Sequence, residues 1–367
     1  MSEMNYKNLS VCIITKDQGS KLKKCLSAVK EHLPEAEIVV TDTGSHDDSM
    51  KIAREFTKNV NVFPWCDDFA AAKNDSVLMA SNDLILILDT DEYIEGMMGD
   101  VKVLISQHEK YPDAVGRIRR TSTFINEQGY KVNYEEWVNR LFDRREFQYE
   151  GCIHEQLVRK NREDKNDYKT YKTTLHILHD GYDLSEEQKQ EKAERNIKLL
   201  KKAISENGED PYLFYQLGKT YFSVKMKEEA SENLLWALEL KPDPDMEYMA
   251  DLIELTGYAL IGTGHADLGL EIAGKYRSEL RYSTDADFMF MYAMLLMNNE
   301  RFDEAIETFI SCTLLDESGT EGTASYMAWY NAGVICEVRG EFEKAREYYK
   351  KAGDFSDAKE GIRRCGA

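Results

Sequence analysis

The chain has 367 residues and carries 47 lysines and arginines against 67 aspartates and glutamates, a formal net charge of −20 at pH 7. A balance this acidic argues against nonspecific nucleic-acid binding and against docking on an anionic membrane by charge, and no stretch approaches the ~18 consecutive apolar residues of a membrane-spanning helix. The start of the chain lacks a signal-peptide pattern and the seven cysteines include no CxxC pair, so we expect a cytoplasmic protein with reduced thiols.

The first half of the chain predicts strands that alternate with helices. Short aliphatic runs followed by helical patterns are typical of parallel strands joined by right-handed crossovers. Beyond Ala114 the segments AVGRIRRTST, VNRLFDRR and FQYEGCIHEQL predict longer, more charged strands that extend the sheet as a mixed sheet. Before that point the predicted strands are 9–14, 38–41, NVFPW at 61–65 and 84–88, and the predicted helices lie around 22–29, in the stretch that ends at Phe56, and at 69–81.

From about residue 186 the sequence becomes helical and repeats itself. Small residues recur at Gly218, Gly257, Ala293 and Gly333, with spacings of 39, 36 and 40 residues. Spacings of this size are typical of a helix-turn-helix unit of about 34 residues with short insertions. The residues around these anchors resemble the tetratricopeptide pattern, in which small side chains allow paired helices to approach closely.

The sequence therefore predicts three parts. An α/β domain occupies residues 1–183, a linker and capping helix occupies 184–208, and an all-α tetratricopeptide solenoid occupies 209–367.

Three acids, Asp89, Asp91 and Glu92, directly follow the aliphatic run from Leu84 to Leu88. A strand this apolar is buried on both faces, so its carboxyl end lies at the rim of the sheet, where open α/β sheets bind ligands. Carboxylates this close repel one another unless a positive group lies between them, and a hard divalent cation is the simplest such group.

We expect the same rim to receive two further segments. Asp42 ends the second strand, in VVTDTGSHDDS, and DDFAAAKNDS places Lys73 and Asn74 on a helix. A carboxylate such as Asp42 accepts hydrogen bonds from a ring N–H or a hydroxyl, and a metal on Asp91 binds phosphates. Lys73 neutralises the phosphate charge that the metal does not.

Five segments in this order resemble glycosyltransferase family 2 over residues 8–182, namely SVCIITKDQ, IVVTDTGSHDDS, WCDDFAAAKNDS, ILILDTDE and GCIHEQL. The branch is the one similar to lipopolysaccharide-core glucosyltransferases and to peptide glycosyltransferases that carry tetratricopeptide repeats. The resemblance implies a GT-A fold, a nucleotide-diphosphate sugar donor such as a UDP-sugar, a Mg²⁺ or Mn²⁺ ion on the DxD motif, and inversion at the anomeric carbon.

The resemblance also implies roles for single residues. Asp42 would contact the nucleotide base, Asp89 the ribose or the metal, and Asp91 the metal, while Lys73 and Asn74 lie on the donor side. Many relatives have arginine where this chain has Lys73, which keeps the charge without the forked geometry of a guanidinium group.

Inverting transfer needs one base to remove the acceptor proton on the face of the sugar opposite the leaving group. The resemblance places GCIHEQL near the acceptor, so we predict Glu155 as the base and His154 as a ligand of the metal or the diphosphate. An exchange of these two roles, or Glu92 as the base, is an open alternative.

The predicted enzyme is a hexosyltransferase-like glycosyltransferase that acts on a protein, peptide or glycan acceptor. The repeats predict an extended concave surface, which suits such an acceptor or a second copy of the chain in a homodimer. A non-catalytic tetratricopeptide scaffold with a vestigial nucleotide-sugar-binding domain is the alternative function. A third reading takes ILILDTDEY as the aspartyl nucleophile of a haloacid-dehalogenase-like phosphatase, although Tyr93 departs from that motif.

Overall fold

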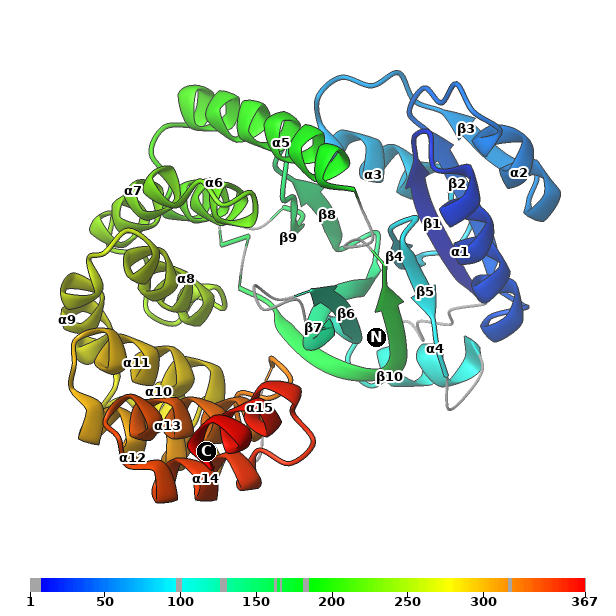
Figure 1. Ribbon diagram of the computed structural model, residues 1–367. Coiled ribbons are helices and arrows are strands. Elements are labelled where there is room, and N and C mark those ends of the chain that lie inside the picture. Colours follow the sequence, from blue (N-terminus) through cyan, green and yellow to red (C-terminus); the bar gives the residue numbers. More distant parts are fainter. Residues whose placement is uncertain are drawn as a thin grey trace. The chain divides into compact units, whose positions relative to one another are not determined.

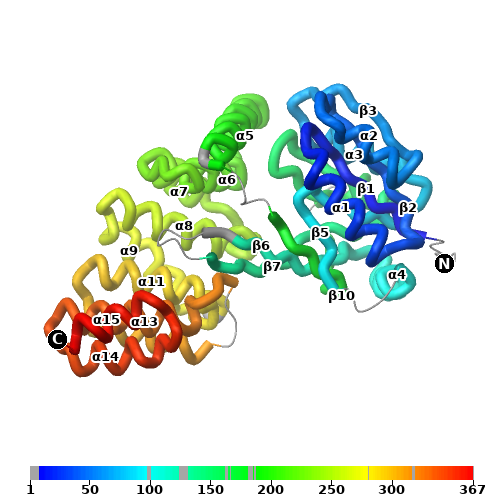
Figure 2. The backbone as a smooth tube through the Cα atoms, turned by 45° about the vertical axis from the view of Figure 1, so that its right-hand side comes forward, coloured from blue at the N-terminus to red at the C-terminus, as the bar shows by residue number. Residues whose placement is uncertain are grey.

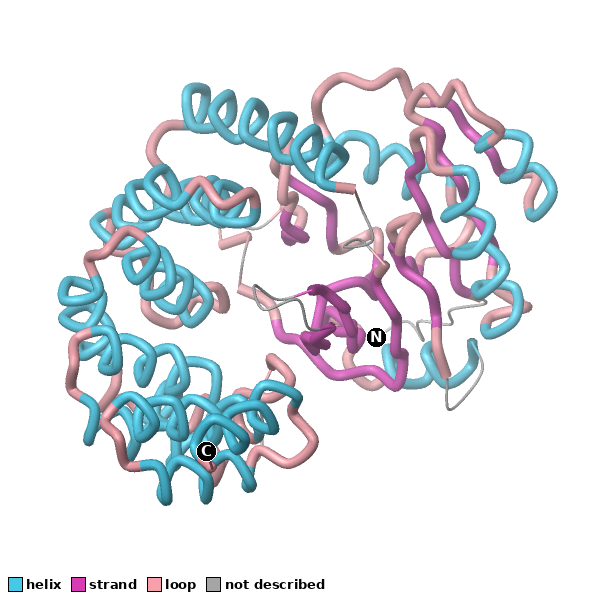
Figure 3. The backbone as a smooth tube through the Cα atoms, in the orientation of Figure 1, coloured by secondary structure: helices cyan, strands magenta, loops and turns pink. Residues whose placement is uncertain are grey.

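The computed structural model describes residues 8–96, 101–125, 131–161, 164–165, 167–180, 185–315 and 319–366. The chain divides into two compact units, Met1–Leu184 and Ser185–Ala367. Figure 3 shows strands together with helices in the first unit and helices joined by loops in the second. Within the described residues, no helix combines the length and the apolar character that a membrane crossing requires.

The first unit is a mixed α/β domain, as the sequence predicts. Its described strands are β1 (Leu9–Thr15), β2 (Glu37–Asp42), β3 (Asn59–Val62), β4 (Leu84–Leu88), β5 (Glu92–Ile94), β6 (Ala114–Ile125), β7 (Lys131–Asp143), β8 (Phe147–Glu150), β9 (Gln156–Arg159) and β10 (Lys169–His179). Its described helices are α1 (Gly19–His32), α2 (Ser49–Phe56), α3 (Phe69–Met79) and α4 (Val101–Glu109).

Eight strands form one sheet in the order β3-β2-β1-β4-β7-β6-β10-β5, and β8 pairs with β9 in a separate two-stranded sheet (Figure 1). The first four strands of this order are parallel to one another. β7 then runs antiparallel to both β4 and β6, whereas β10 is parallel to β6. The parallel half arises from the helical crossovers, and the second half, which contains both parallel and antiparallel pairs, is the mixed extension that the charged strands predict.

Both faces of the central sheet are covered because its strands are apolar on both faces. Leu84, Leu86 and Leu88 of β4 pack in one core cluster with α1 and α4. Ile85 and Ile87, which point to the opposite face, pack in a second cluster with α3 and β8. The carboxyl end of β4 is therefore fixed between two packed layers.

Two strand predictions are wrong in their extent. The segment FQYEGCIHEQL is not one strand, because β8 and β9 are joined by residues 151–155, where Gly151 has a φ of 101° and His154 a φ of 49°. Left-handed backbone of this kind ends a strand. The segment NVFPW is a strand only as far as Val62, since Pro64 has no N–H to continue the ladder.

The second unit is entirely helical within its described residues, and its helices follow one another in chain order from α6 (green) to α15 (red) in Figure 2. The helices are α5 (Glu186–Asn207), α6 (Pro211–Ser223), α7 (Lys227–Glu239), α8 (Met249–Gly262), α9 (Ala266–Tyr276), α10 (Leu280–Ser283), α11 (Ala286–Asn298), α12 (Phe302–Cys312), α13 (Tyr326–Val338), α14 (Phe342–Lys351) and α15 (Ser356–Cys365).

The small residues of the repeat pattern lie where paired helices touch. A Cβ atom on Gly218 would lie 2.6 Å from Leu234 Cγ, and one on Gly333 would lie 2.6 Å from Tyr349 Cδ1. These distances leave no room for a side chain, so glycine is required for the close packing of α6 on α7 and of α13 on α14. The predicted helix-turn-helix repeats are confirmed.

Candidate active site

The carboxyl ends of β2 and β4 meet at one rim of the sheet, with β1 between them. Thr15 of β1 is level with Asp42, and Ile13 of β1 is level with Leu88, the last residue of β4. Neighbouring strands lie about 4.8 Å apart, so Asp42 and the acids after β4 are two strand spacings from each other. A ligand the length of a nucleotide can reach both.

Asp42 is 1% exposed and its two carboxylate oxygens differ. Oδ1 accepts hydrogen bonds of 2.9 Å from the backbone N–H groups of Gly44 and Ser45, which fixes the turn after β2. Oδ2 is buried, and no donor among the described residues reaches it. A buried acceptor without a donor costs about 1–3 kcal/mol, so a ligand N–H or O–H at this position would be stabilised.

Asp89, the first residue after β4, lies between two cationic groups. Its Oδ2 is 2.7 Å from Arg140 Nη2 and its Oδ1 is 3.2 Å from Lys73 Nζ. Burial by itself would raise the pKa of Asp89, but the charges of Arg140 and Lys73 outweigh it and hold that pKa well below its usual range. Asp89 is therefore an anion, and both of its oxygens are already engaged.

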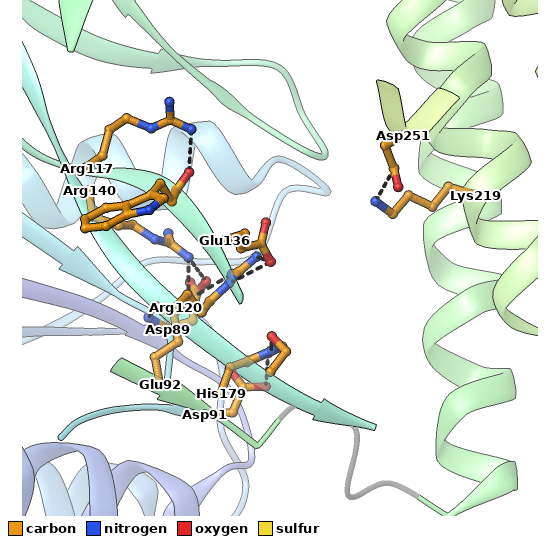
Figure 4. A network of polar contacts seen from close by, with 12 residues as sticks. Asp89, Asp91, Glu92, Arg117, Arg120, Glu136, Arg140, His179, Lys219 and Asp251 are labelled. Carbon is orange, nitrogen blue, oxygen red and sulfur yellow. Dashed lines mark hydrogen bonds and ion pairs between the residues drawn. The ribbon is translucent and has the colours of Figure 1, made fainter. Parts of the chain in front are cut away.

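Glu92 anchors a second part of the same network, which Figure 4 shows. Its carboxylate is fully buried and lies 2.7 Å from Arg140 Nη2 and 3.1 Å from Arg120 Nη1. It also accepts a hydrogen bond of 3.0 Å from the N–H of Asp89. With its oxygens bound and no exposure to solvent, Glu92 stabilises the turn after β4, which argues against the alternative that it serves as the base.

Lys73 lies on α3 and links the rim to the loop between β8 and β9. Its ammonium group is 2.6 Å from Glu155 Oε1 as well as 3.2 Å from Asp89, and 5% of its side chain is exposed. Burial disfavours the charged form, but the two carboxylates raise the pKa of Lys73 above its usual value. The structure thus brings together Lys73, Asp89 and Glu155, three residues that the sequence assigned to the site.

Asn74 is placed differently from its neighbour Lys73. Its amide donates to the carbonyl of Tyr149 at 2.8 Å and accepts from the N–H of Tyr149 at 2.9 Å. Both polar groups of the side chain are therefore bound to the backbone of β8. This pair of hydrogen bonds holds β8, and with it the loop that carries Glu155, against α3.

His154 precedes Glu155 in the left-handed turn of that loop. The loop is tied to the start of α3, because Cys152 accepts a hydrogen bond of 2.9 Å from the N–H of Phe69. The carbonyl of His154 accepts a hydrogen bond of 3.0 Å from Gln156 Nε2. These contacts set the position of the His154–Glu155 pair relative to Lys73.

Asp91 lies next to a histidine that the sequence did not assign to the site. His179 Nε2 is 3.7 Å from Asp91 Oδ2 (Figure 4), and His179 Nδ1 is 3.0 Å from Ser122 Oγ. The backbone N–H of Asp180 donates to the carbonyl of Asp91 at 2.9 Å. The end of β10 therefore supports the acidic turn after β4.

Residues 10–162 match the model described as glycosyl transferase family 2. The N-terminal unit is a family 2 glycosyltransferase domain. Residues 211–244, 286–318 and 328–352 match the tetratricopeptide repeat model, so repeats follow the transferase domain, as the sequence predicts. The class of reaction is sugar transfer.

The chain is similar to a TPR repeat-containing protein of Synechococcus elongatus, with 29% identity over 280 residues that cover 76% of this chain and 67% of that protein. It is similar to the SPbeta prophage-derived glycosyltransferase SunS of Bacillus subtilis, with 25% identity over 318 residues that cover 83% of this chain and 71% of SunS. Among solved structures it is similar to YrrB, a TPR protein with an unusual peptide-binding site, with a TM-score of 0.40, 24% identity, and coverage of 47% of this chain and 85% of YrrB.

The residues that follow β4 carry ligand atoms that a divalent cation accepts. Asp91 Oδ2 and His179 Nε2 are an oxygen and a nitrogen 3.7 Å apart, and the carboxylate of Asp89 is paired with Lys73 and Arg140. In the part of the chain that the structure describes, no group of three or more histidine, cysteine, aspartate or glutamate side chains could hold a metal. A metal with few protein ligands suits a site in which diphosphate oxygens and water complete the shell.

Sequence reasoning assigned Lys73 to this transferase site but did not assign Arg120 or Arg140. Arg140 is 8% exposed, and it pairs with Asp89 and, together with Arg120, with Glu92. The one available signal was the spacing of charged residues within apolar strands, such as arginine in VNRLFDRR. Which acid each arginine meets depends on the antiparallel register of β6 and β7, which the sequence does not determine.

Proposed function

We propose that the transferase domain moves a sugar, with inversion, from a nucleotide-diphosphate sugar to an acceptor hydroxyl or thiol with the help of a divalent cation. The observation that carries the proposal is the joint position of Asp42, whose buried Oδ2 has no donor among the described residues, and of Asp91 at the same sheet rim. The end of the rim at Asp42 suits a hydrogen bond from an N–H group of a nucleotide base. The end at Asp91 suits a cation that binds a diphosphate.

In this proposal three carboxylates bind three different parts of the sugar donor. Asp42 accepts a hydrogen bond from the nucleotide base, with a UDP-sugar as the expected donor. Asp89, oriented by Lys73 and Arg140, accepts a hydrogen bond from the ribose. Asp91 binds the Mn²⁺ or Mg²⁺ ion, which when bound offsets the negative charge that develops on the departing diphosphate.

Glu155 is the proposed base, and Lys73 positions it. The carboxylate is 12% exposed and is held from one side by the ammonium group of Lys73. It removes the proton of the acceptor as the acceptor oxygen or sulfur bonds to the anomeric carbon, and the bond from that carbon to the diphosphate breaks with its electron pair on the diphosphate. His154, its neighbour, is assigned to the diphosphate.

Three measurements on the full chain test this function. A thermal-shift screen of UDP-, GDP- and dTDP-sugars with Mn²⁺ is expected to raise the melting temperature with one nucleotide class, since a ligand of the folded state stabilises by mass action. Release of the nucleoside diphosphate is then expected to fall at least 10²-fold in Asp91→Asn. Proton NMR of the first product reports whether the anomeric configuration inverts.

Asp83→Asn is the matched control. Asp83 lies directly before β4, just as Asp89 lies directly after it. Its carboxylate pairs with Arg144 at 3.2 Å and Arg145 at 3.3 Å, at the opposite end of the strand. We expect normal release of nucleoside diphosphate from this variant if it remains folded. Donor binding without turnover in the unmodified chain would favour the alternative of a vestigial domain beside a scaffold.

We propose that the repeats hold a protein, peptide or glycan acceptor. The first helices of two adjacent repeats, α6 and α8, carry a polar and aromatic group in which Lys219 Nζ lies 2.6 Å from Asp251 and the ring of Tyr215 stacks on Tyr248 at 5.1 Å. Half of the Lys219 side chain is exposed. Asp251→Ala is expected to lower acceptor glycosylation and leave donor hydrolysis unchanged, and sedimentation of the chain reports whether a homodimer forms.

A further inference from the structure

The first helices of neighbouring repeats carry side chains at equivalent positions. Gly218 of α6, Gly257 of α8 and Ala293 of α11 mark the repeat, with spacings of 39 and 36 residues. The same spacings relate three positions at the contact of α6 with α8 to three positions at the contact of α8 with α11. The equivalent pairs are Tyr215 and Glu254, Lys219 and Tyr258, and Asp251 and Asp287.

The contact between α6 and α8 holds a lysine between a tyrosine and an aspartate. Lys219 Nζ lies 2.6 Å from Asp251 Oδ2, as Figure 4 shows, and it donates to Tyr215 Oη at 3.1 Å. It also lies 5.4 Å from the centre of the Tyr215 ring, within the range of cation–π attraction. The ammonium group therefore offsets the charge of the carboxylate at this contact.

The equivalent contact between α8 and α11 has no lysine at the three positions. Glu254 replaces the tyrosine, Tyr258 replaces the lysine, and Asp287 keeps the aspartate. The carboxylate of Asp287 accepts hydrogen bonds from Thr323 Oγ1 at 2.6 Å and from the N–H of Thr320 at 2.9 Å, which fixes it at the start of α11. Two acids thus stand where the first contact has one acid and one cation.

Glu254 is the acid that lacks a partner. It is half-buried, and among the described residues no hydrogen bond or ion pair engages its carboxylate. Burial raises the pKa of Glu254, and the carboxylates of three nearby aspartates raise it further. These are Asp287, Asp285 and Asp251. Lys219 acts in the opposite direction, but its ammonium group is already bound to Asp251, so an added cation would stabilise Glu254 as an anion.

The contact between α11 and α13 differs from both. Its equivalent positions are Phe290, Met294 and Met327. These side chains are apolar and offer no carboxylate to a cation. Of the three contacts compared, only that between α8 and α11 combines two acids with no basic residue.

We infer that Glu254 and Tyr258 form a binding site for the cationic side chain of a lysine or arginine in a peptide or protein acceptor. The inference rests on the proposed function, in which the repeats hold the acceptor. The cation of the acceptor takes the role that Lys219 has in the first contact, because it offsets a carboxylate and lies against a tyrosine ring. The net charge of −20 also steers a basic partner toward the chain.

Saturation-transfer-difference NMR with the full-length chain tests the inference, since it detects weak ligands. The probe is a short peptide of glycine and serine with one central arginine, and its control carries citrulline, which has a similar shape without the charge. We expect the unmodified chain to bind the arginine peptide about 10-fold more tightly than the citrulline peptide. Glu254→Gln is expected to remove this preference. Glu271→Gln, at an exposed acid of α9 that lies 3.2 Å from Lys275, should keep it.

A second variant supplies the cation from within the chain. Tyr258→Lys places a lysine at the position equivalent to Lys219. It is expected to lose the preference for the arginine peptide and to melt at a higher temperature than the unmodified chain, because Glu254 gains a partner. Weaker binding together with higher stability distinguishes an occupied site from a damaged fold.

Equal binding of the two peptides by the unmodified chain would overturn the inference, as would a preference for arginine that survives in Glu254→Gln. A Tyr258→Lys chain that still prefers the arginine peptide and melts no higher would contradict it as well. The transferase is tested separately by the release of nucleoside diphosphate from the unmodified chain. Absence of that release, with the arginine preference intact, would overturn the proposed function and leave the cation site standing.

Discussion

The ammonium nitrogen of Lys73 lies 2.6 Å from Glu155 Oε1. Helix α3 therefore directly contacts the loop between β8 and β9 that carries the proposed base. The same nitrogen lies 3.2 Å from Asp89. One buried charge therefore joins the turn after β4 to the loop between β8 and β9. The position of Glu155 depends on Lys73, and Lys73 in turn remains charged because of both acids.

Lys73→Met is expected to lower kcat/KM by about 10²-fold or more, as the loss of a preorganised charge in an active site does. The reason is that Glu155 and Asp89 lose the cation between them. Lys165→Met is the control, since Lys165 makes a similar 2.8 Å contact with Glu150 at the surface, where half of its side chain is exposed. Equal activity of the two variants in a nucleoside diphosphate release assay would contradict the role of Lys73.

Arg140→Met is expected to destabilise the transferase domain by about 3–5 kcal/mol, the usual cost of removing one partner from a buried ion pair. Asp89 and Glu92 would lose the guanidinium group they share. Urea unfolding measures the change. Arg119→Met, which removes a half-exposed arginine 3.9 Å from Glu135, should shift stability by about 0.5 kcal/mol or less. A similar loss in both variants would show that the Arg140 network contributes little.

The stability of the transferase domain is expected to fall as the pH drops from about 6.5 to about 4. His108 is fully buried on α4, with Nδ1 3.0 Å from Tyr171 Oη, and burial lowers its pKa from 6.5 to about 4. Between these values the unfolded chain binds a proton that the folded chain does not, so protonation favours unfolding. The effect is at most about 3 kcal/mol.

His108→Gln, which keeps a hydrogen-bonding side chain but cannot titrate, should lose most of this pH dependence in thermal unfolding. His46→Gln should retain it, because 90% of the His46 side chain is exposed. An unchanged pH profile in His108→Gln would assign the acid sensitivity to other groups.

Gly333→Ala is expected to destabilise the repeats by up to about 2 kcal/mol, because overpacking costs about 1–3 kcal/mol while alanine gains about 1 kcal/mol of helix propensity. The added Cβ would lie 2.6 Å from the ring of Tyr349, which is fully buried. At Gly274 of α9 the nearest neighbour would be 4.0 Å away, so Gly274→Ala should raise the melting temperature. Circular dichroism melting compares the two, and a stabilising Gly333→Ala would show that the helices can separate without cost.

The roles of two histidines show where sequence reasoning stopped. His154 lies in GCIHEQL and His179 in LHILHDGYD, and both segments contain a glycine and an acid. The sequence around each histidine therefore does not reveal which of the two lies near Asp91. The answer depends on the pairing of β10 with β5 and β6, in which the paired residues are 55 or more positions apart in the chain. The role of Asn74 also could not be read from the sequence, because the residue whose backbone it binds, Tyr149, is 75 positions away.

The sequence by itself determined the periodic features of this protein. Apolar runs, helical spacing and the recurrence of Gly218, Gly257, Ala293 and Gly333 report local geometry, so they predicted the α/β domain, the repeats and the rim that carries Asp42, Asp89 and Asp91. Only the tertiary structure decided the charge pairing at that rim. Lys73, Arg120 and Arg140 reach the acids across strand registers and helix packing, and such contacts between distant segments leave no period in the sequence.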